Sequence, residues 1–208
     1  MANYKLIFNN NSNLFGTFCV YQRDPAQSTK SNLFSLAWFT HPSRPNTTAT
    51  YTWDVNYCFT WSETGQLKPG VTFTASQTID ADPVDPAKHQ TTCLNKNIYG
   101  YSFVDTPLKA PENAMTIYTD ATIPHGEVSV GIGMAGMPTF AYPATPNYSY
   151  TFKPHPEYWV VFGDYRTGQV LDVNIVSNTC KVDFANGIYT MEVTLSKQNT
   201  WQITSVDF

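Results

Sequence analysis

The sequence predicts an all-β protein, an antiparallel β-sandwich of roughly 12–14 short strands with no substantial helix. Three observations predict this class. Residues 48–61 alternate without a break between an aromatic-rich parity and a threonine-rich parity, which is the period of a β-strand. Turn-forming residues recur about every 8–12 positions. No window of about a dozen residues shows the 3.6-residue period of a helix.

The alternating segment is the centre of the predicted sheet. Its aromatic-rich parity consists of Ala49, Tyr51, Trp53, Val55, Tyr57, Phe59 and Trp61. One strand of this length would extend for roughly 46 Å, which is longer than strands usually are. We therefore expect a bend, bulge or turn at Asp54-Val55-Asn56, where strand propensity is locally weakest.

Further strands are expected on both sides of this segment. The expected strands are residues 3–9, 14–22, 33–39, 71–76, 98–104, 115–119, 127–130, 148–152, 158–162, 169–173, 181–184, 189–195 and 201–206. Loops are expected at residues 23–32, 41–46, 79–91 and 142–146, which hold prolines. Two hairpins are expected near the C-terminus. One pairs residues 158–162 with 169–173, and the other pairs 181–184 with 189–195 across Asn186-Gly187.

Length and composition favour a single domain, residues 1–208, with low charge. Charged residues make up only 13% of the chain and the formal net charge is −4. No lysine and arginine cluster offers the basic footprint that nucleic acid requires, so nucleic-acid binding is not expected. No stretch approaches 18 apolar residues, and no membrane span is expected. Without the apolar stretch of a signal peptide we expect a cytoplasmic protein, with leaderless export still open.

The four cysteines are scattered and form no CxxC pair. They are Cys19, Cys58, Cys93 and Cys180. Three disulfide connectivities can be drawn, but reduced thiols are the favoured interpretation in the absence of a secretion signal.

One short motif matches the dinucleotide-binding fingerprint by letter. Gly131, Gly133 and Gly136 stand at the GxGxxG spacing after an expected strand. That fingerprint requires a helix to begin there, and Met137-Pro138 followed by Thr-Phe-Ala-Tyr-Pro cannot form one. We interpret the glycines as part of a strand against which a backbone or a bulky ring packs closely.

Other candidate chemistry is weaker, so no cofactor, no metal and no catalytic residue is predicted. Asp80, Asp82 and Asp85 share a loop, but two prolines interrupt the frame of an EF-hand. His41, His89, His125 and His155 show no local metal-ligand spacing. Carboxylates for a glycoside hydrolase could be drawn from Asp54, Glu63, Asp80 or Glu157, although nothing selects a pair.

The aromatic residues are the remaining candidates for a binding site. Sugar sites place a ring face against the C–H face of the sugar and use nearby amides and carboxylates for the hydroxyls. The candidate ligand-binding residues are Trp38, Trp53, Asp54, Asn56, Tyr57 and Trp61. The competing interpretation is that rings spaced this regularly are the core of a sandwich.

Several runs of the sequence resemble the RhiA-like proteins, a rhizosphere-expressed bacterial family. They are Val20-Tyr21-Gln22, Ser35-Leu36-Ala37-Trp38-Phe39, the run from Trp53 to Gly65, Leu67-Lys68-Pro69-Gly70-Val71, Val130-Gly131-Ile132-Gly133-Met134 and Pro154-His155-Pro156-Glu157-Tyr158-Trp159. The resemblance implies a quorum-regulated setting and involvement with a plant host, but no activity and no catalytic residues. We interpret Pro154-His155-Pro156 as a structural corner.

The sequence thus predicts a non-catalytic interaction protein that associates with itself as a homo-oligomer or larger assembly. Low charge, abundant Thr, Asn and Tyr, and many strand edges favour association. A carbohydrate-binding module that recognises a glycan or host surface is the second hypothesis, and a hydrolase is the third.

Overall fold

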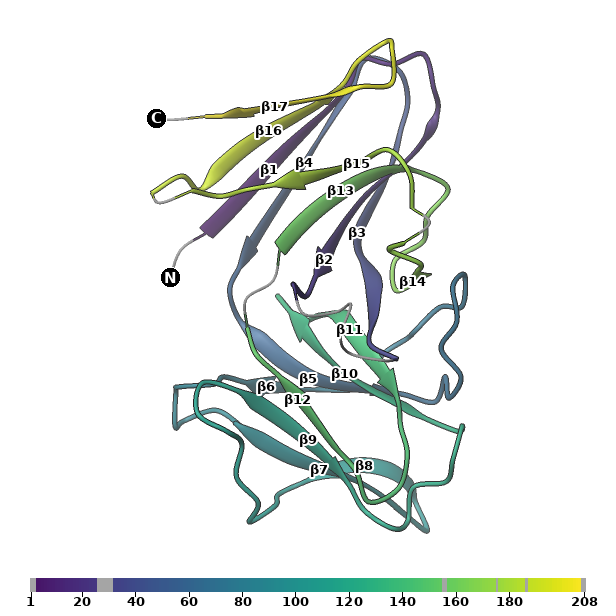
Figure 1. Ribbon diagram of the computed structural model, residues 1–208, viewed down its shortest axis with the longest axis vertical. Helices are drawn as coiled ribbons and strands as arrows, with labels where there is room; N and C mark the ends of the chain where they lie inside the picture. The colour runs from purple at the N-terminus through teal and green to yellow at the C-terminus, as the bar shows by residue number, and fades with distance from the viewer. Residues whose placement is uncertain (1–2, 26–31, 155–156, 175, 186, 207–208) are drawn as a thin grey trace.

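The computed structural model describes residues 3–25, 32–154, 157–174, 176–185 and 187–206. Within these residues the chain forms strands and no helix (Figure 1). The all-β prediction is therefore confirmed. None of the described segments is a helix long and apolar enough to cross a membrane.

The strands form three sheets. The upper sheet has the order β17-β16-β1-β4, the lower sheet has the order β12-β9-β7-β8, and the long sheet between them has the order β15-β13-β2-β3-β11-β10-β5-β6, with β14 paired to β3. The strand bounds are β1 Asn3–Asn10, β2 Gly16–Arg23, β3 Phe34–Ser43, β4 Thr47–Asp54, β5 Tyr57–Ser62, β6 Gln77–Ala81, β7 Thr91–Asn97, β8 Gly100–Val104, β9 Met115–Thr119, β10 Ser129–Met134, β11 Met137–Pro143, β12 Ser149–Phe152, β13 Glu157–Gly163, β14 Val170–Leu171, β15 Thr179–Val182, β16 Thr190–Leu195 and β17 Trp201–Ser205.

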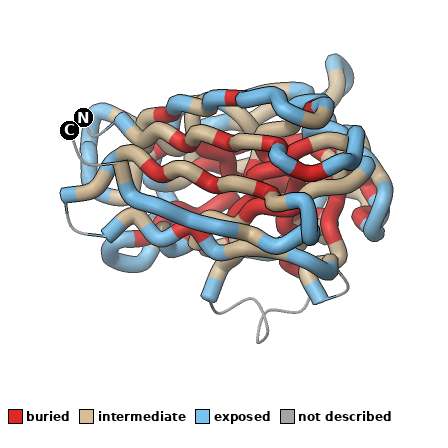
Figure 2. The backbone as a smooth tube through the Cα atoms, turned by 90° about the horizontal axis from the view of Figure 1, so that it is seen from above, coloured by how far each residue is buried: buried red, intermediate tan, exposed pale blue. Residues whose placement is uncertain are grey.

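The two largest hydrophobic cores lie in the upper and lower halves of the structure. The upper core packs the upper sheet against β15, β13, β2 and β3, and it contains Phe8, Phe18 and Trp53. The lower core packs the lower sheet against β11, β10, β5 and β6, and it contains Phe59 and Trp61. Strand β3 joins the two halves, because it pairs with β2 near its end and with β11 near its start. Buried backbone runs through the interior, while most turns are exposed (Figure 2).

The predicted break in the long alternating segment is confirmed. Strand β4 ends at Asp54 and β5 begins at Tyr57, so Val55 and Asn56 carry the chain from the upper sheet to the long sheet. One alternating run therefore supplies aromatic rings to two different cores. We call the region of this crossing, between the two cores, the waist.

Several expected boundaries were wrong. Residues 41–43 lie in β3 and not in the expected loop. At these positions β3 pairs with β2 only, and a proline is tolerated in a strand whose other side has no partner strand. Residues 71–76 form no strand, since the Phe73 N–H bonds to the Gly168 carbonyl at 2.8 Å, and the strand is β6 instead. The expected loops at residues 79–91 and 142–146 overlap strands at Ile79–Ala81 in β6, at Thr91 in β7 and at Tyr142–Pro143 in β11.

The expected C-terminal hairpins were also wrong. Strand β13 pairs with β2 and β15, whereas β14 pairs with β3. Strand β16 runs parallel to β1 and antiparallel to β17, so burial of its apolar face against the upper core outweighs the local turn signal. Asn186 of the proposed turn, His155 and Pro156 of the proposed corner, and residues 26–31 of the first expected loop lie outside the described residues.

Candidate functional site

The three predicted tryptophans are packed inside the protein. Trp38, Trp53 and Trp61 are 0%, 3% and 5% exposed. Trp38 occupies a β-bulge opposite Val20 and Tyr21, and its Nε1–H donates to the Met134 carbonyl at 3.1 Å. None of the three offers a free ring face. These tryptophans therefore provide no exposed ring for the predicted stacking against a sugar.

Asp54, Asn56 and Tyr57 lie together at the waist and are half-buried. The Asn56 N–H donates to the Asp54 carbonyl and the Ala135 N–H donates to the Asn56 carbonyl, both at 2.9 Å. The first bond closes the crossing on itself, and the second joins it to the turn between β10 and β11. Burial raises the pKa of Tyr57, so its hydroxyl stays neutral.

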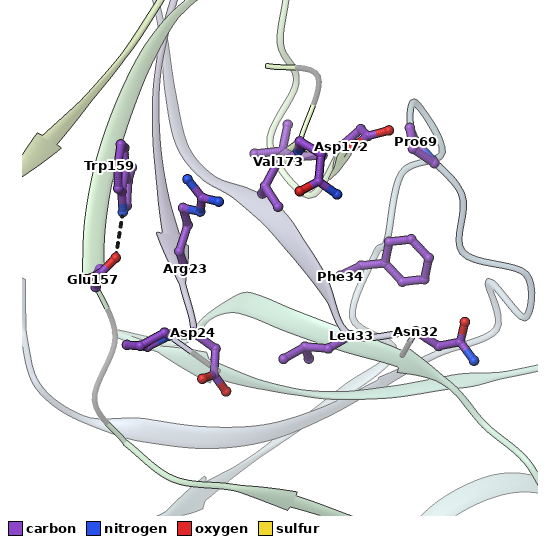
Figure 3. A pocket seen from close by; sticks show the side chains of 13 residues that line it. Arg23, Asp24, Asn32, Leu33, Phe34, Pro69, Glu157, Trp159, Asp172 and Val173 are labelled. Carbon is purple, nitrogen blue, oxygen red and sulfur yellow. Dashed lines mark hydrogen bonds between the residues drawn. The ribbon is translucent and has the colours of Figure 1, made fainter. Parts of the chain in front are cut away.

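A cleft of about 560 Å³ opens beside the waist. Strand β2, the start of β3, strand β13 and the chain after β14 contribute its walls. Its lining includes Arg23, Asp24, Phe34, Glu157, Trp159 and Asp172. Figure 3 shows Arg23 between Trp159 and the hollow, Asp24 below it and Phe34 on the opposite side. We call this the waist cleft.

Cross-strand pairing assembles one wall of the waist cleft. Arg23 of β2 lies opposite Glu157 of β13, and Lys181 of β15 lies opposite Trp159. Side chains of such partners share one face of the sheet. Glu157 accepts hydrogen bonds from Lys181 Nζ at 2.7 Å and from Trp159 Nε1 at 3.2 Å. The Arg23 guanidinium stacks over the Trp159 ring at 4.8 Å.

The electrostatics of this wall follow from those contacts. The hydrogen bond from Lys181, with that from Trp159 and the nearby charge of Arg23, holds the pKa of Glu157 below its usual range. The same bond raises the pKa of Lys181. Both groups therefore stay charged at neutral pH, and the indole of Trp159 is fixed on two sides.

A second, shallower cleft of about 300 Å³ adjoins the waist on the other side of Glu157. Aromatic rings dominate its lining, with Tyr4, Tyr57, Tyr158 and Phe184 contributing. Tyr4 packs edge-on against Phe184 with ring centroids 5.0 Å apart, and it stacks on Trp53 at 5.9 Å. These rings continue outward from the upper core.

A family model described as RhiA matches residues 1–206. The chain belongs to the RhiA family. It is 36% identical over 204 residues to Protein RhiA of Rhizobium leguminosarum bv. viciae, which covers 96% of this chain and 85% of that protein. No solved structure gives a significant match. The resemblance predicted from the sequence is confirmed, and its motif residues Glu157, Tyr158 and Trp159 line the two clefts.

The glycine motif of this RhiA-family chain is part of a β-hairpin. Gly131 and Gly133 lie in β10, where an added Cβ would collide with the Phe140 and Met137 carbonyls of β11. Ala135 and Gly136 form the two-residue turn with φ of 51° and 74°, as a type I′ hairpin requires. The predicted close backbone approach is confirmed.

The acidic loop of the RhiA-family chain uses its carboxylates locally. Asp82 Oδ1 accepts the N–H groups of Val84 and Asp85 at 2.8 Å, and Asp85 Oδ1 accepts that of Ala87 at 2.9 Å. In the described part of the chain no three His, Cys, Asp or Glu residues group as metal ligands.

Two surface features of the RhiA-family chain escaped the sequence analysis. Ile98 and Tyr99 form the turn between β7 and β8 and are 90% and 91% exposed. Isoleucine and tyrosine have high strand propensity, so the sequence predicted that these two residues belong to a strand at residues 98–104. The second feature is the waist cleft, whose walls come from segments far apart in the chain. Among its residues only Glu157 had been named as candidate chemistry, as one of several carboxylates from which nothing selected a pair.

Proposed function

We propose that this RhiA-family protein is a non-catalytic interaction protein that associates with itself through the open edge of β17. The observation that carries the proposal is the composition of that edge. Strand β17 contains only Trp, Gln, Ile, Thr and Ser, with no charge and no proline. It ends the upper sheet, and residues 202–205 are exposed. An unprotected edge of this kind is a template for pairing with another chain.

Three other edges of the described sheets, β15, β6 and β8, carry protection that β17 lacks. Strand β15 presents Lys181 and strand β6 presents Asp80. On β8, the Phe103 N–H is already bonded by Gln77 Oε1 at 3.0 Å. Charges and occupied backbone groups are common ways to prevent pairing at an edge.

The backbone of β17 has free groups in the right places. Two hydrogen bonds at the ends of the β16–β17 hairpin show which residue pairs are hydrogen-bonded. The Ser196 N–H donates to the Thr200 carbonyl at 2.9 Å, and the Val206 N–H donates to the Thr190 carbonyl at 3.0 Å. Bonded pairs alternate in an antiparallel ladder, so the N–H and C=O groups of Trp201, Ile203 and Ser205 face outward.

A second copy related by a twofold axis would use these groups. Ile203 would then lie opposite Ile203 of the other copy, and Trp201 opposite Ser205. Ile203 is 36% exposed, and pairing would remove its remaining surface from water. A twofold contact of this kind is self-complementary and closes as a dimer.

The non-catalytic part of the proposal is supported by the state of the waist cleft. Glu157 is tied to Lys181 and Trp159, which lower its pKa and hold it ionised. It is therefore poorly suited to donate a proton near neutral pH. We place the assembly in the bacterial, quorum-regulated and host-associated setting that the family resemblance implied.

The test is the mass of the native particle by light scattering behind a sizing column at micromolar concentration. We expect a multiple of the 23.4 kDa chain mass. Ile203→Pro removes an outward N–H without removing a bond to β16, so it should give a folded particle of one chain mass. Gln202→Thr, which keeps the strand uncharged and every backbone N–H in place, is the control and should associate as the wild type does. A wild-type monomer, or an Ile203→Pro variant that still associates, overturns the proposal.

A further inference from the structure

The waist cleft is separate from the edge of β17. Its described residues come from β2, β3, β13 and β14, from the chain next to these strands, and from Pro69 between β5 and β6, and none of them belongs to β17. A volume of about 560 Å³ lies within the range of small-molecule sites, which is roughly 300–1,000 Å³.

One wall of the cleft is rigid and aromatic. Trp159 is held through its Nε1–H by Glu157 and through its ring by Arg23. Glu157 is in turn held by Lys181 at 2.7 Å. A side chain fixed from several directions loses little conformational entropy when a ligand binds, which is how preorganised sites gain affinity.

The opposite side and the floor are largely apolar. Leu33, Phe34 and Leu171 line this part, and Val173 adds a half-buried methyl surface. Such a surface suits the C–H groups of a ligand. It offers nothing to a small, fully hydrated ion.

The polar groups around the rim are mixed in kind. Arg23, Asn32 and Asn174 can donate hydrogen bonds, and Asp24, Glu157 and Asp172 can accept them. With Glu157 neutralised by Lys181, the rim carries Asp24 and Asp172 beside the Arg23 guanidinium, and this near-balance of charge favours neither an anion nor a cation. Hydroxyl groups both donate and accept, so a neutral polyol can satisfy both sets.

We propose that the waist cleft binds a neutral, polyhydroxylated ligand of the size of a short oligosaccharide. The apolar floor takes its C–H faces. Asp172, whose Oδ1 also accepts the Asn174 N–H at 3.1 Å, and the amides of Asn32 and Asn174 take its hydroxyls, and the stacked Arg23–Trp159 pair forms the end wall. The site differs from the tryptophan-based site expected from the sequence, because those rings are core.

The experiment is titration calorimetry with cellobiose, maltose and lactose as neutral probes and digalacturonic acid as the anionic probe. At least one neutral disaccharide should saturate the protein. Asp172→Asn, which keeps the shape but weakens an acceptor, should lower that affinity about tenfold. Glu127→Gln is the matched control, because it removes a carboxylate in the lower half, outside the cleft, and should bind as the wild type does.

Three results would overturn this inference. They are failure of all three neutral disaccharides to bind, an Asp172→Asn variant that binds as tightly as the wild type, and tighter binding of digalacturonic acid. Thermal melting verifies that Asp172→Asn is folded, and Arg23→Lys replaces it if it is not. Ile203→Pro should bind the disaccharide normally, so the outcome is separable from that of the self-association test.

Discussion

Trp61 and Gln77 are joined by a hydrogen bond from the indole Nε1–H to the side-chain oxygen Oε1 at 2.9 Å. The same oxygen accepts the backbone N–H of Phe103 at 3.0 Å. One amide oxygen of β6 therefore satisfies a donor on β5 and a donor on β8, which belong to facing sheets. The contact explains how a buried tryptophan in the lower core meets its hydrogen-bonding requirement.

Gln77→Leu should destabilise the protein by about 2 kcal/mol, because it leaves both donors without their acceptor. Urea unfolding measured by fluorescence gives the change in the free energy of unfolding. Gln77→Glu keeps an oxygen at this position and should cost less than Gln77→Leu. A loss for Gln77→Leu within the roughly 0.5 kcal/mol typical of neutral surface changes would contradict this account.

Glycines of the GxGxxG motif should differ in their tolerance of a side chain. Gly131→Ala brings a Cβ onto the Phe140 carbonyl and should cost about 3 kcal/mol or more. Gly136→Ala meets open space and strains only a left-handed turn residue at φ 74°, so it should cost about 1–2 kcal/mol. Thermal melts of both variants make the comparison. Equal effects would argue against the hairpin interpretation.

The class of the fold could be predicted from the sequence because side-chain alternation is a local property. The break at Asp54-Val55-Asn56 was predictable for the same reason. Strand pairing was not, because it depends on which distant apolar faces bury each other. The parallel contact of β16 with β1 joins the two ends of the chain, and no local signal at Tyr189 to Leu195 announces it.

The aromatic alternation also could not reveal which rings would be exposed. Trp53 and Trp61 share one parity, yet the crossing at the waist sends them into separate cores. Trp159 lines the cleft between Arg23 and Lys181, which lie on the two strands next to β13. These neighbours are set by the pairing of β13 with β2 and β15. A site assembled by pairing becomes visible only when the pairing is known.

The four free cysteines should fall into two reactivity classes. Cys19 and Cys58 are buried, and burial raises the pKa of Cys58 to about 11. At pH 8 only about one Cys58 thiol in a thousand would be the reactive thiolate. Cys93 and Cys180 are only half-buried, although burial raises their pKa as well. With a chromogenic disulfide reagent we expect two thiols to react in the native protein and two only after denaturation. Four equal rates would contradict this burial pattern.

The ion pair of Glu157 with Lys181 should make part of the stability depend on pH. The folded-state pKa of Glu157 is lowered, so its contribution is present above the usual carboxyl pKa of about 4.3 and is lost as pH falls through the folded value. The pKa of Lys181 is raised, so its contribution is present below about pH 10.4 and is lost as pH rises through the folded value.

Melting temperatures of Glu157→Gln and wild type should therefore differ at neutral pH and converge in acid. Glutamine cannot ionise, so the acid side of the stability profile becomes shallower in the variant. Lys181→Met should give a similar change at neutral pH, and the double variant should add little, because each change removes the same contact. Glu63→Gln removes the same charge from an exposed position and is the control. A difference between wild type and Glu157→Gln that persists undiminished at low pH would assign the effect to packing of Trp159 and not to the ionised pair.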